Sequence, residues 1–464
     1  MSARKIGFLI LILAFGAVVE TAWSVRENRF YFGPEGFRIL GGRFYGPSFT
    51  FEESTERAVP VDQELEIEVR NSFGDVRILP GEGASVRVDL RKVVFRPTEE
   101  KARAFAERVE LRFEEEDGRV RIGTNRDDVP GREKVGFETH LDLHIPEEAR
   151  AVVRNDHGSV EVSGIARAEI RASYGDVRVE RIEGPVFVKA RHGAVHATEL
   201  GAELSLESRH GDVEVVGVTG HSTLDVQHGA LTVRRSATLE AKASYGDFVA
   251  ESVGGDLTLE ARHAGAVIAD VAGSVDVQTS YEGVRLERIE GNVTVRVEHG
   301  SVRAEEVKGA LTAEASHDGV WLDGVSGHVE VAVRGGGLEA RELKAGAHVR
   351  SRGDVSIDGF GGAIDVETEG GDVLLKPGRP ITEPVIASAK KGAMRLEVPA
   401  GSRFTLEAES RHGELVLDVP ELERSLGNGR ITGTIGGGGV TVQLAADQDV
   451  TVTPGGSALP AERP

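Results

Sequence analysis

The feature that most constrains this chain is a short phrase that returns at a nearly constant interval between Asn155 and Asp372. Two of its copies are Asp-His-Gly-Ser-Val-Glu-Val at 156–162 and Arg-His-Gly-Asp-Val-Glu-Val at 209–215. A histidine or tyrosine stands one or two residues before the glycine of each copy, and successive rings are 17 or 18 residues apart. A period this constant predicts one supersecondary unit stacked many times. The ring positions are His157, Tyr174, His192, His210, His228, Tyr245, His263, Tyr281, His299 and His317.

Each unit has the pattern of two short strands. Between Tyr174 and Arg191, apolar and charged residues alternate on both sides of the pair Gly184-Pro185. Alternation with a period of two indicates half-buried strands, and glycine near each end of a strand indicates tight turns. A long hairpin meander and a parallel β-solenoid both contain such strands, but the constant unit length favours the solenoid. The predicted fold is therefore all-β, a parallel β-solenoid of about 18 residues per coil.

The residues at the predicted inward positions are Val, Leu, Ile, Ala, Ser and Thr, with almost no aromatics. Side chains of this size predict a narrow, flattened bore. Coils stacked at about 4.8 Å would place equivalent residues in rows along the rod.

Composition limits the classes of partner. The net charge of −21 argues against nucleic acid and against an anionic membrane surface. The chain has no cysteine, so disulfides and thiolate metal sites are excluded.

Residues 1–23 are predicted to be a targeting segment. Arg4 and Lys5 precede an apolar run from Ile6 to Val19, which is short for a spanning helix and typical of a signal-peptide core. Glu20 and Trp23 stand where a cleavage site would need small residues, so a cleaved signal peptide and an uncleaved inner-membrane anchor over residues 6–23 both remain open. Both predict an exported protein of the cell envelope, periplasmic or extracellular. A buried N-terminal helix is the remaining alternative.

Two further segments precede the regular repeats. Residues 24–58 hold eight aromatic residues among glycines, and they are interpreted either as a linker that contacts the envelope or a partner, or as a tail that covers the first coil. Residues 59–150 are predicted to cap the solenoid, because they contain the repeat phrase once, at 71–78. In this module a short helix is expected after Thr98 as N-cap, running to about Val109, with strands near 109–114, 119–123 and 137–145.

The regular repeats span residues 151–376. Beyond them the spacing between phrases loosens, and residues 377–453 are predicted to form irregular final coils and a C-terminal cap. Residues 454–464 are rich in Pro and Gly and are predicted to be a disordered tail.

The recurrent histidines have two interpretations. Stacked imidazoles could bind a transition metal or titrate together between about pH 5 and 7. Tyrosine at 174, 245 and 281 argues for a structural ladder instead, because tyrosine is a poor substitute for a zinc ligand. Counting by twos from Val186 places His192 on the inward side at a corner, where its ring would bond to turn backbone. His412 carries the same phrase near the C-terminus.

The aspartate after the glycine also has two interpretations. Calcium-binding solenoids need several converging oxygen ligands in each turn on a nine-residue period, whereas this chain has one acid per 18 residues. A turn-capping role is therefore preferred. The positions are Asp75, Asp176, Asp212, Asp247, Asp354 and Asp372.

No enzymatic motif interrupts the period, and Gly436 to Gly439 lack the Lys-Ser/Thr that a phosphate-binding loop requires. No catalytic, cofactor-binding or metal-binding residue is assigned, and no cofactor is expected. Outward rows mix charges from coil to coil, as in Lys189, Glu207 and Asp225, which is typical of a solvated face with interstrand charge pairs.

The chain resembles the bacterial putative-adhesin β-helix family, an exported domain of unknown function. The resemblance covers roughly residues 60–453 and rests on Asn-Ser-Phe-Gly-Asp-Val at 71–76, Leu-Asp-Leu-His-Ile-Pro at 141–146, the repeats, and Ile-Gly-Gly-Gly-Gly-Val at 435–440. It implies a β-solenoid at the cell envelope.

The predicted function is a non-catalytic envelope β-solenoid, an adhesin-like binding or scaffold module. Its expected partner is an envelope or extracellular glycan or protein, with contact to a membrane through the N-terminal segment alone. The alternatives are a carbohydrate-active β-helix enzyme, a polysaccharide lyase or hydrolase, and a scaffold of the envelope-stress response. The oligomeric state is left open.

Overall fold

The computed structural model describes residues 39–40, 43–44, 47–59, 65–116, 118–131, 133–419, 423–427 and 430–455. The predictions for residues 1–23 and for most of the tail after 454 lie outside these ranges. No helix in the described ranges has the length and apolar character needed to cross a membrane. The chain forms two compact units. Unit 1 comprises Met1–Glu53, Leu90–Leu111 and Thr124–His140, and unit 2 comprises Ser54–Asp89, Arg112–Gly123 and Leu141–Pro464.

Unit 1 holds the α-helix of the described residues, α2 (Glu99–Ala106). The predicted N-cap is confirmed, because the Thr98 hydroxyl accepts a hydrogen bond from the Lys101 amide at 3.4 Å. Acidic residues in the first turn favour this start electrostatically. The helix ends at Ala106, one turn before the expected Val109.

The core of unit 1 is built around the buried rings of Phe105 and Phe137, whose centroids lie 5.1 Å apart. Phe49 and Phe51 of the aromatic segment pack against this core. The short strands β1 (Ile39–Leu40) and β2 (Arg43–Phe44) pair antiparallel. Two 3-10 turns, η1 (Asn125–Asp128) and η2 (Lys134–Gly136), complete the unit.

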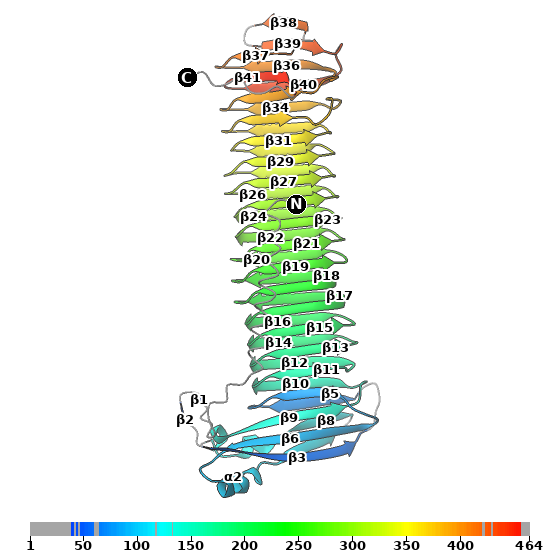
Figure 1. Cartoon of the computed structure of the whole chain (residues 1–464), viewed down its shortest axis with the longest axis vertical. Coiled ribbons are helices and arrows are strands. Elements are labelled where there is room, and N and C mark those ends of the chain that lie inside the picture. Colours follow the sequence, from blue (N-terminus) through cyan, green and yellow to red (C-terminus); the bar gives the residue numbers. More distant parts are fainter. Residues whose placement is uncertain are drawn as a thin grey trace. The chain divides into compact units, whose positions relative to one another are not determined.

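Unit 2 contains the solenoid, in which each coil contributes one strand to each of two parallel sheets (Figure 1). Equivalent residues pair at intervals of one coil, as Ala168 with Val186 in the first sheet and Val177 with Val195 in the second. About 14 turns of about 18 residues stack in this way, which confirms the predicted all-β parallel β-solenoid.

The regular strands of the first sheet are β10 (Arg150–His157), β12 (Arg167–Tyr174), β14 (Val186–His192), β16 (Leu204–His210), β20 (Leu257–Arg262), β22 (Val275–Tyr281), β24 (Val293–His299), β26 (Leu311–Ala315), β28 (Val329–Val333), β30 (Ala347–Ser351), β32 (Ile364–Thr368) and β34 (Val385–Ala389). Those of the second sheet are β11 (Val160–Ser163), β13 (Val177–Ile182), β15 (Val195–Leu200), β19 (Phe248–Val253), β21 (Ala266–Val271), β23 (Val284–Ile289), β25 (Val302–Val307), β27 (Val320–Val325), β29 (Leu338–Leu343), β31 (Val355–Phe360), β33 (Val373–Lys376) and β35 (Met394–Val398).

Two long strands, β17 (Val213–Gln227) and β18 (Leu231–Ser244), run from the second sheet around the corner into the first. The register between them shifts at the bend, between Val218 and His221.

The core of the solenoid lies between the two sheets. Inward residues such as Val177 and Val179 are fully buried, and the residues between them face outward. Most inward side chains are aliphatic, with Phe248 and Phe404 as the largest fully buried ones. The bore is therefore narrow, in agreement with the size of the residues at these positions in the sequence.

At the N-terminal end of the regular coils, strand order departs from sequence order. β4 (Glu66–Asn71) lies between β10 and β8 (Arg119–Thr124), and β5 (Val76–Pro80) lies between β11 and β9 (Phe137–Ile145). The coil formed first along the chain is thus the second in the stack. The other strands before the regular coils are β3 (Ser48–Ala58), which pairs with β6 (Ser85–Phe95), and β7 (Leu111–Glu116).

At the C-terminal end, strand order departs from sequence order in the same way. β40 (Val440–Ala446) inserts between β34 and β36 (Phe404–Ser410), and β41 (Val450–Pro454) inserts between β35 and β37 (Leu415–Leu417). Beyond β36, the antiparallel strands β39 (Arg430–Ile435) and β38 (Glu423–Gly427) continue the stack. A change to antiparallel pairing ends the parallel template that another chain could extend.

Candidate binding surfaces

Eleven aromatic rings stack face to face along one corner of the solenoid, from Phe73 to His317, and form what we call the ring ladder. Neighbouring centroids lie between 3.9 Å (His299 to His317) and 5.0 Å (Tyr281 to His299) apart, and most ring planes are nearly parallel. All ten predicted ring positions belong to the ladder, which Phe73 extends by one. His412 lies outside it, with its Nδ1 atom 2.8 Å from the Asp447 carboxylate.

The predicted inward orientation of the rings is wrong. Tyr174, Tyr245 and Tyr281 are 47 to 58% exposed, and His192 is exposed as well. Strict alternation of buried and outward residues stops at Arg191, because the next residue, His192, also faces outward where β14 runs into the turn at Gly193. Counting by twos fails once the backbone leaves the pleated strand.

Close backbone approach at the turn explains the glycine where it directly follows the ring, as Gly193 follows His192. Gly193 has a φ of +129°, and a Cβ atom on it would lie 2.2 Å from the Gly175 carbonyl oxygen of the preceding coil. The absence of side chains lets successive turns stack at the strand spacing, which holds the rings in contact.

Five of the six predicted aspartates cap turns, but the turn that each one caps belongs to the next coil. Asp176 Oδ1 accepts a hydrogen bond from the Ala194 amide at 2.9 Å, and Asp212 Oδ1 accepts one from the Ala230 amide at 3.0 Å. Asp75, Asp354 and Asp372 make the same contact. Each such carboxylate stabilises the stacking of one coil on another.

The ladder has the electrostatics of crowded imidazoles. Desolvation, followed by the nearby His192, His228 and Arg209, lowers the pKa of His210. Nδ1 of His317 lies 2.7 Å from the Glu298 carbonyl oxygen. Among the described residues there is no group of three or more His, Asp or Glu side chains placed to hold a metal ion.

Charged side chains on the outer faces pair with one another. Lys189 and Glu207, on adjacent strands of the first sheet, are 2.5 Å apart, and Arg288 holds the Asp270 carboxylate through two contacts of 2.6 and 2.9 Å. Such exposed pairs each contribute about 0–1 kcal/mol. They link charged side chains of neighbouring coils on the outer faces.

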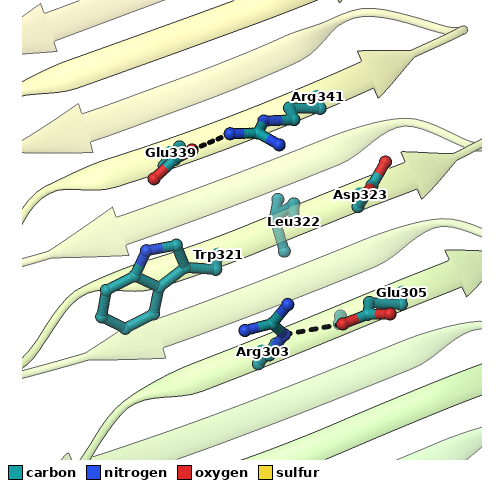
Figure 2. A pocket seen from close by; sticks show the side chains of 8 residues that line it. Arg303, Glu305, Trp321, Leu322, Asp323, Glu339 and Arg341 are labelled. Carbon is teal, nitrogen blue, oxygen red and sulfur yellow. Dashed lines mark hydrogen bonds and ion pairs between the residues drawn. The ribbon is translucent and has the colours of Figure 1, made fainter. Parts of the chain in front are cut away.

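A depression of about 260 Å³ lies among these charged pairs on the second sheet, around Trp321 on β27 (Figure 2). In register with Trp321 stand Arg303 on one neighbouring strand and Glu339 on the other. The next outward row holds Glu305, Asp323 and Arg341 in the same order.

Four of the charged side chains around the Trp321 depression form ion pairs within their own strands. Arg303 contacts Glu305 and Arg341 contacts Glu339, each at 2.6 Å within its own strand. Asp323 lies between these two pairs and is exposed, and no ion pair engages it among the described residues. Trp321 is 41% exposed, and Figure 2 shows its indole ring lying broadside over the sheet.

A second depression, of about 390 Å³, lies on the first sheet beside the half-buried Phe187. Arg150 on its rim contacts Glu66 at 3.2 Å and Glu169 at 2.5 Å. Arg150 is therefore paired, and the aromatic ring of this depression is more covered than that of Trp321.

A family model for Toastrack DUF4097 matches residues 252–453. This range is similar to the Toastrack DUF4097 family. The match confirms the resemblance to the putative-adhesin β-helix family over this range. For residues 60–251 the resemblance remains a prediction.

The crystal structure of a putative cell adhesion protein from Clostridium sporogenes is similar to the chain at 8% sequence identity. The likeness covers 87% of this chain and 100% of the other, with a TM-score of 0.17. No curated protein matches the chain.

The range matched by the family model contains the Trp321 depression and the inserted strands β40 and β41. Our sequence analysis did not identify Trp321 as a candidate. The signal was present, because residues 303, 321 and 339 are 18 apart and a tryptophan stands between an arginine and a glutamate. An alignment of outward rows by the coil period would have found it.

Proposed function

We propose that the chain is a non-catalytic β-solenoid of the cell envelope that acts as an adhesin-like binding or scaffold module. The observation that carries this proposal is the Trp321 depression, in which an exposed aromatic ring and polar groups share a small hollow. Binding sites combine an apolar contact surface with a few fixed polar groups in this way. Trp321 is also a residue type that contributes strongly at interfaces.

The solenoid gives such a site a rigid support. Trp321, Arg303 and Glu339 lie on three neighbouring strands whose backbones are hydrogen-bonded in register. A site built on strands loses little conformational entropy when a ligand binds. The long outer faces suit an extended polymer or a protein partner.

The main alternative is a carbohydrate-active enzyme. It is favoured by the placement of Glu305 directly opposite Asp323 on adjacent strands, since glycoside hydrolases use two carboxylates. Against it, Glu305 is already held by Arg303 at 2.6 Å and approached by Arg285 at 3.7 Å. We therefore favour binding without catalysis.

A panel of envelope and extracellular polysaccharides and proteins, incubated with the full chain, tests the proposal. Binding must be measured together with product analysis in the same samples. Binding with intact ligand is the expected result. Cleavage of a polysaccharide would replace the proposal by the enzyme alternative, and failure to bind any member of the panel would contradict a binding role.

The proposed location rests on the sequence of residues 1–23. Fractionation of cells that produce the full chain, compared with a variant lacking these residues, tests export. We expect the full chain in the envelope fraction and the truncated chain in the cytoplasm. A partner that is recovered with the full chain and lost when residues 24–58 are deleted would favour the envelope-stress scaffold instead.

A further inference from the structure

We infer that the Trp321 depression binds a neutral pyranose sugar, presented as one unit of a β-linked glycan chain. This inference rests on the proposed binding function and assigns its ligand class and its site. It starts from the difference between Trp321 and the other exposed rings of the solenoid.

The rings of the ladder cover one another. Tyr245, for example, has His228 on one face at 4.8 Å and His263 on the other at 5.0 Å between centroids. Such rings offer their edges to a ligand, and their faces are already occupied. The ladder is therefore a structural element of the corner and a poor platform for stacking.

Trp321 has its ring face open instead. No ring-stacking partner engages it among the described residues, and Figure 2 shows the indole broadside to the viewer over the strand. Gly319 makes room for this pose, because a Cβ atom there would lie 3.2 Å from Cη2 of the indole. An exposed, flat aromatic face is suited to the C–H face of a pyranose ring, which is apolar and of similar width.

The polar groups around the indole suit hydroxyl groups. Asp323 is an acceptor that no ion pair engages, two residues along the same strand. Arg303 and Arg341 supply donors from the strands on either side, and each keeps one carboxylate partner. Hydroxyl groups can donate to the carboxylate and accept from the guanidinium groups, so both kinds of group are satisfied by one sugar.

Charge selects the class of sugar. The five ionic groups of the depression are two arginines and three carboxylates, and the whole chain carries −21. A polyanionic polysaccharide would meet repulsion on approach. A neutral sugar with equatorial hydroxyl groups, such as glucose or N-acetylglucosamine in β linkage, keeps an apolar face for the indole and a polar rim for Asp323.

The test is calorimetric titration of the full chain with cellohexaose and chitohexaose as probes, and with hexagalacturonate as the anionic comparison. We expect binding of at least one neutral probe and none of the anionic one. Trp321→Ala should weaken that binding about tenfold or more, equivalent to about 1.4 kcal/mol. Trp321→Phe should retain part of it, and Asp323→Ala should weaken it by a smaller factor.

A matched control removes a similarly exposed apolar side chain elsewhere. Ile386 is 45% exposed and does not line the depression, so Ile386→Ala should bind like the parent chain. Trp23→Phe leaves Trp321 as the sole tryptophan of the chain, and its fluorescence should then change when the neutral probe is added.

The possible failures are distinguishable. If both neutral probes fail to bind, or if Trp321→Ala binds as well as Ile386→Ala, the assignment of the sugar site is overturned. The proposed binding function would still stand if another member of the wider panel bound the chain. If no member bound, both would fall.

Discussion

The close stacking of turns predicts that Gly193→Ala destabilises the solenoid far more than Gly217→Ala. A Cβ atom on Gly193 would lie 2.2 Å from the Gly175 carbonyl oxygen, whereas ordinary C···O contacts are about 3.3 Å or longer. One coil would have to move from the next by roughly 1 Å, in a stack held by hydrogen bonds on both sides. The φ of +129° adds conformational strain for an L-residue.

The strain and the overlap together predict a loss of about 3–5 kcal/mol for Gly193→Ala. Gly217 has a φ of +75°, but the atom nearest to an added Cβ is 3.6 Å away. Only the left-handed conformation is then unfavourable, at about 1–2 kcal/mol. Glu199 and Arg235, with φ of 54° and 56° at the equivalent corner one coil before and after, show that side chains are accepted there.

Urea unfolding followed by far-ultraviolet circular dichroism measures both variants against the parent. Because a solenoid is stabilised between nearest neighbours, the transition of Gly193→Ala should also become less cooperative. Hydrogen exchange should locate the loss of protection in the coils around residue 193. Equal destabilisation of the two variants would refute the argument that contact between turns, and not φ alone, demands glycine.

Three further changes test the corners. Asp212→Ala should lower the free energy of unfolding by about 1–2 kcal/mol because the Ala230 amide loses its acceptor, whereas Asp212→Asn should lower it by less than about 1 kcal/mol. The urea midpoints of the two variants measure this difference, and equal losses of stability would contradict the capping role. The lowered pKa of His210 makes the unfolded chain bind more protons near pH 6, so stability should fall as the pH drops below the unfolded value of about 6.5. His210→Tyr should flatten that dependence in thermal melts between about pH 5 and 7, and an unchanged slope would exclude His210 as a source. Glu199→Gly should stabilise the solenoid by up to about 1 kcal/mol, because it relieves the strain of a φ of 54° at an exposed corner. Part of this gain is lost because glycine gives the unfolded chain more conformational entropy. A lower urea midpoint would show that the corner is not strained.

Periodicity predicted the parts of this fold that repeat. The interval of 17 or 18 residues corresponds to the register in which Ala168 pairs with Val186, so strand pairing followed from the spacing of equivalent residues. The ring positions followed for the same reason. The orientation of the rings did not, because it depends on the backbone path through the turn at Gly193, which alternation in the strand does not describe.

The repeat period could not predict the strand order at the two ends of the solenoid. The repeat phrase at 71–78 was recognised within a capping module, but the place of β4 and β5 between β8–β9 and β10–β11 depends on pairings between residues far apart in sequence, such as Val69 with Ile122. A strand that can pair with one sheet edge can pair almost equally well with another edge of the same residue pattern. Which edge it joins is decided by loop length and by the packing of the whole end, and neither is periodic.

The Trp321 depression shows where functional information lies in a repeat protein. Residue types that recur from coil to coil, such as the turn glycine and the aspartate cap, are explained by stacking, because stacking is what the coils share. Trp321 stands in a row where the neighbouring coils place Arg303 and Glu339, so stacking does not explain a tryptophan there. The exposed indole is therefore better explained by a ligand than by the fold. Trp321→Arg, which places the residue type of Arg303 in this row, should preserve the stability of the solenoid and abolish binding of the neutral sugar. A loss of stability would show that Trp321 serves the fold instead of a ligand.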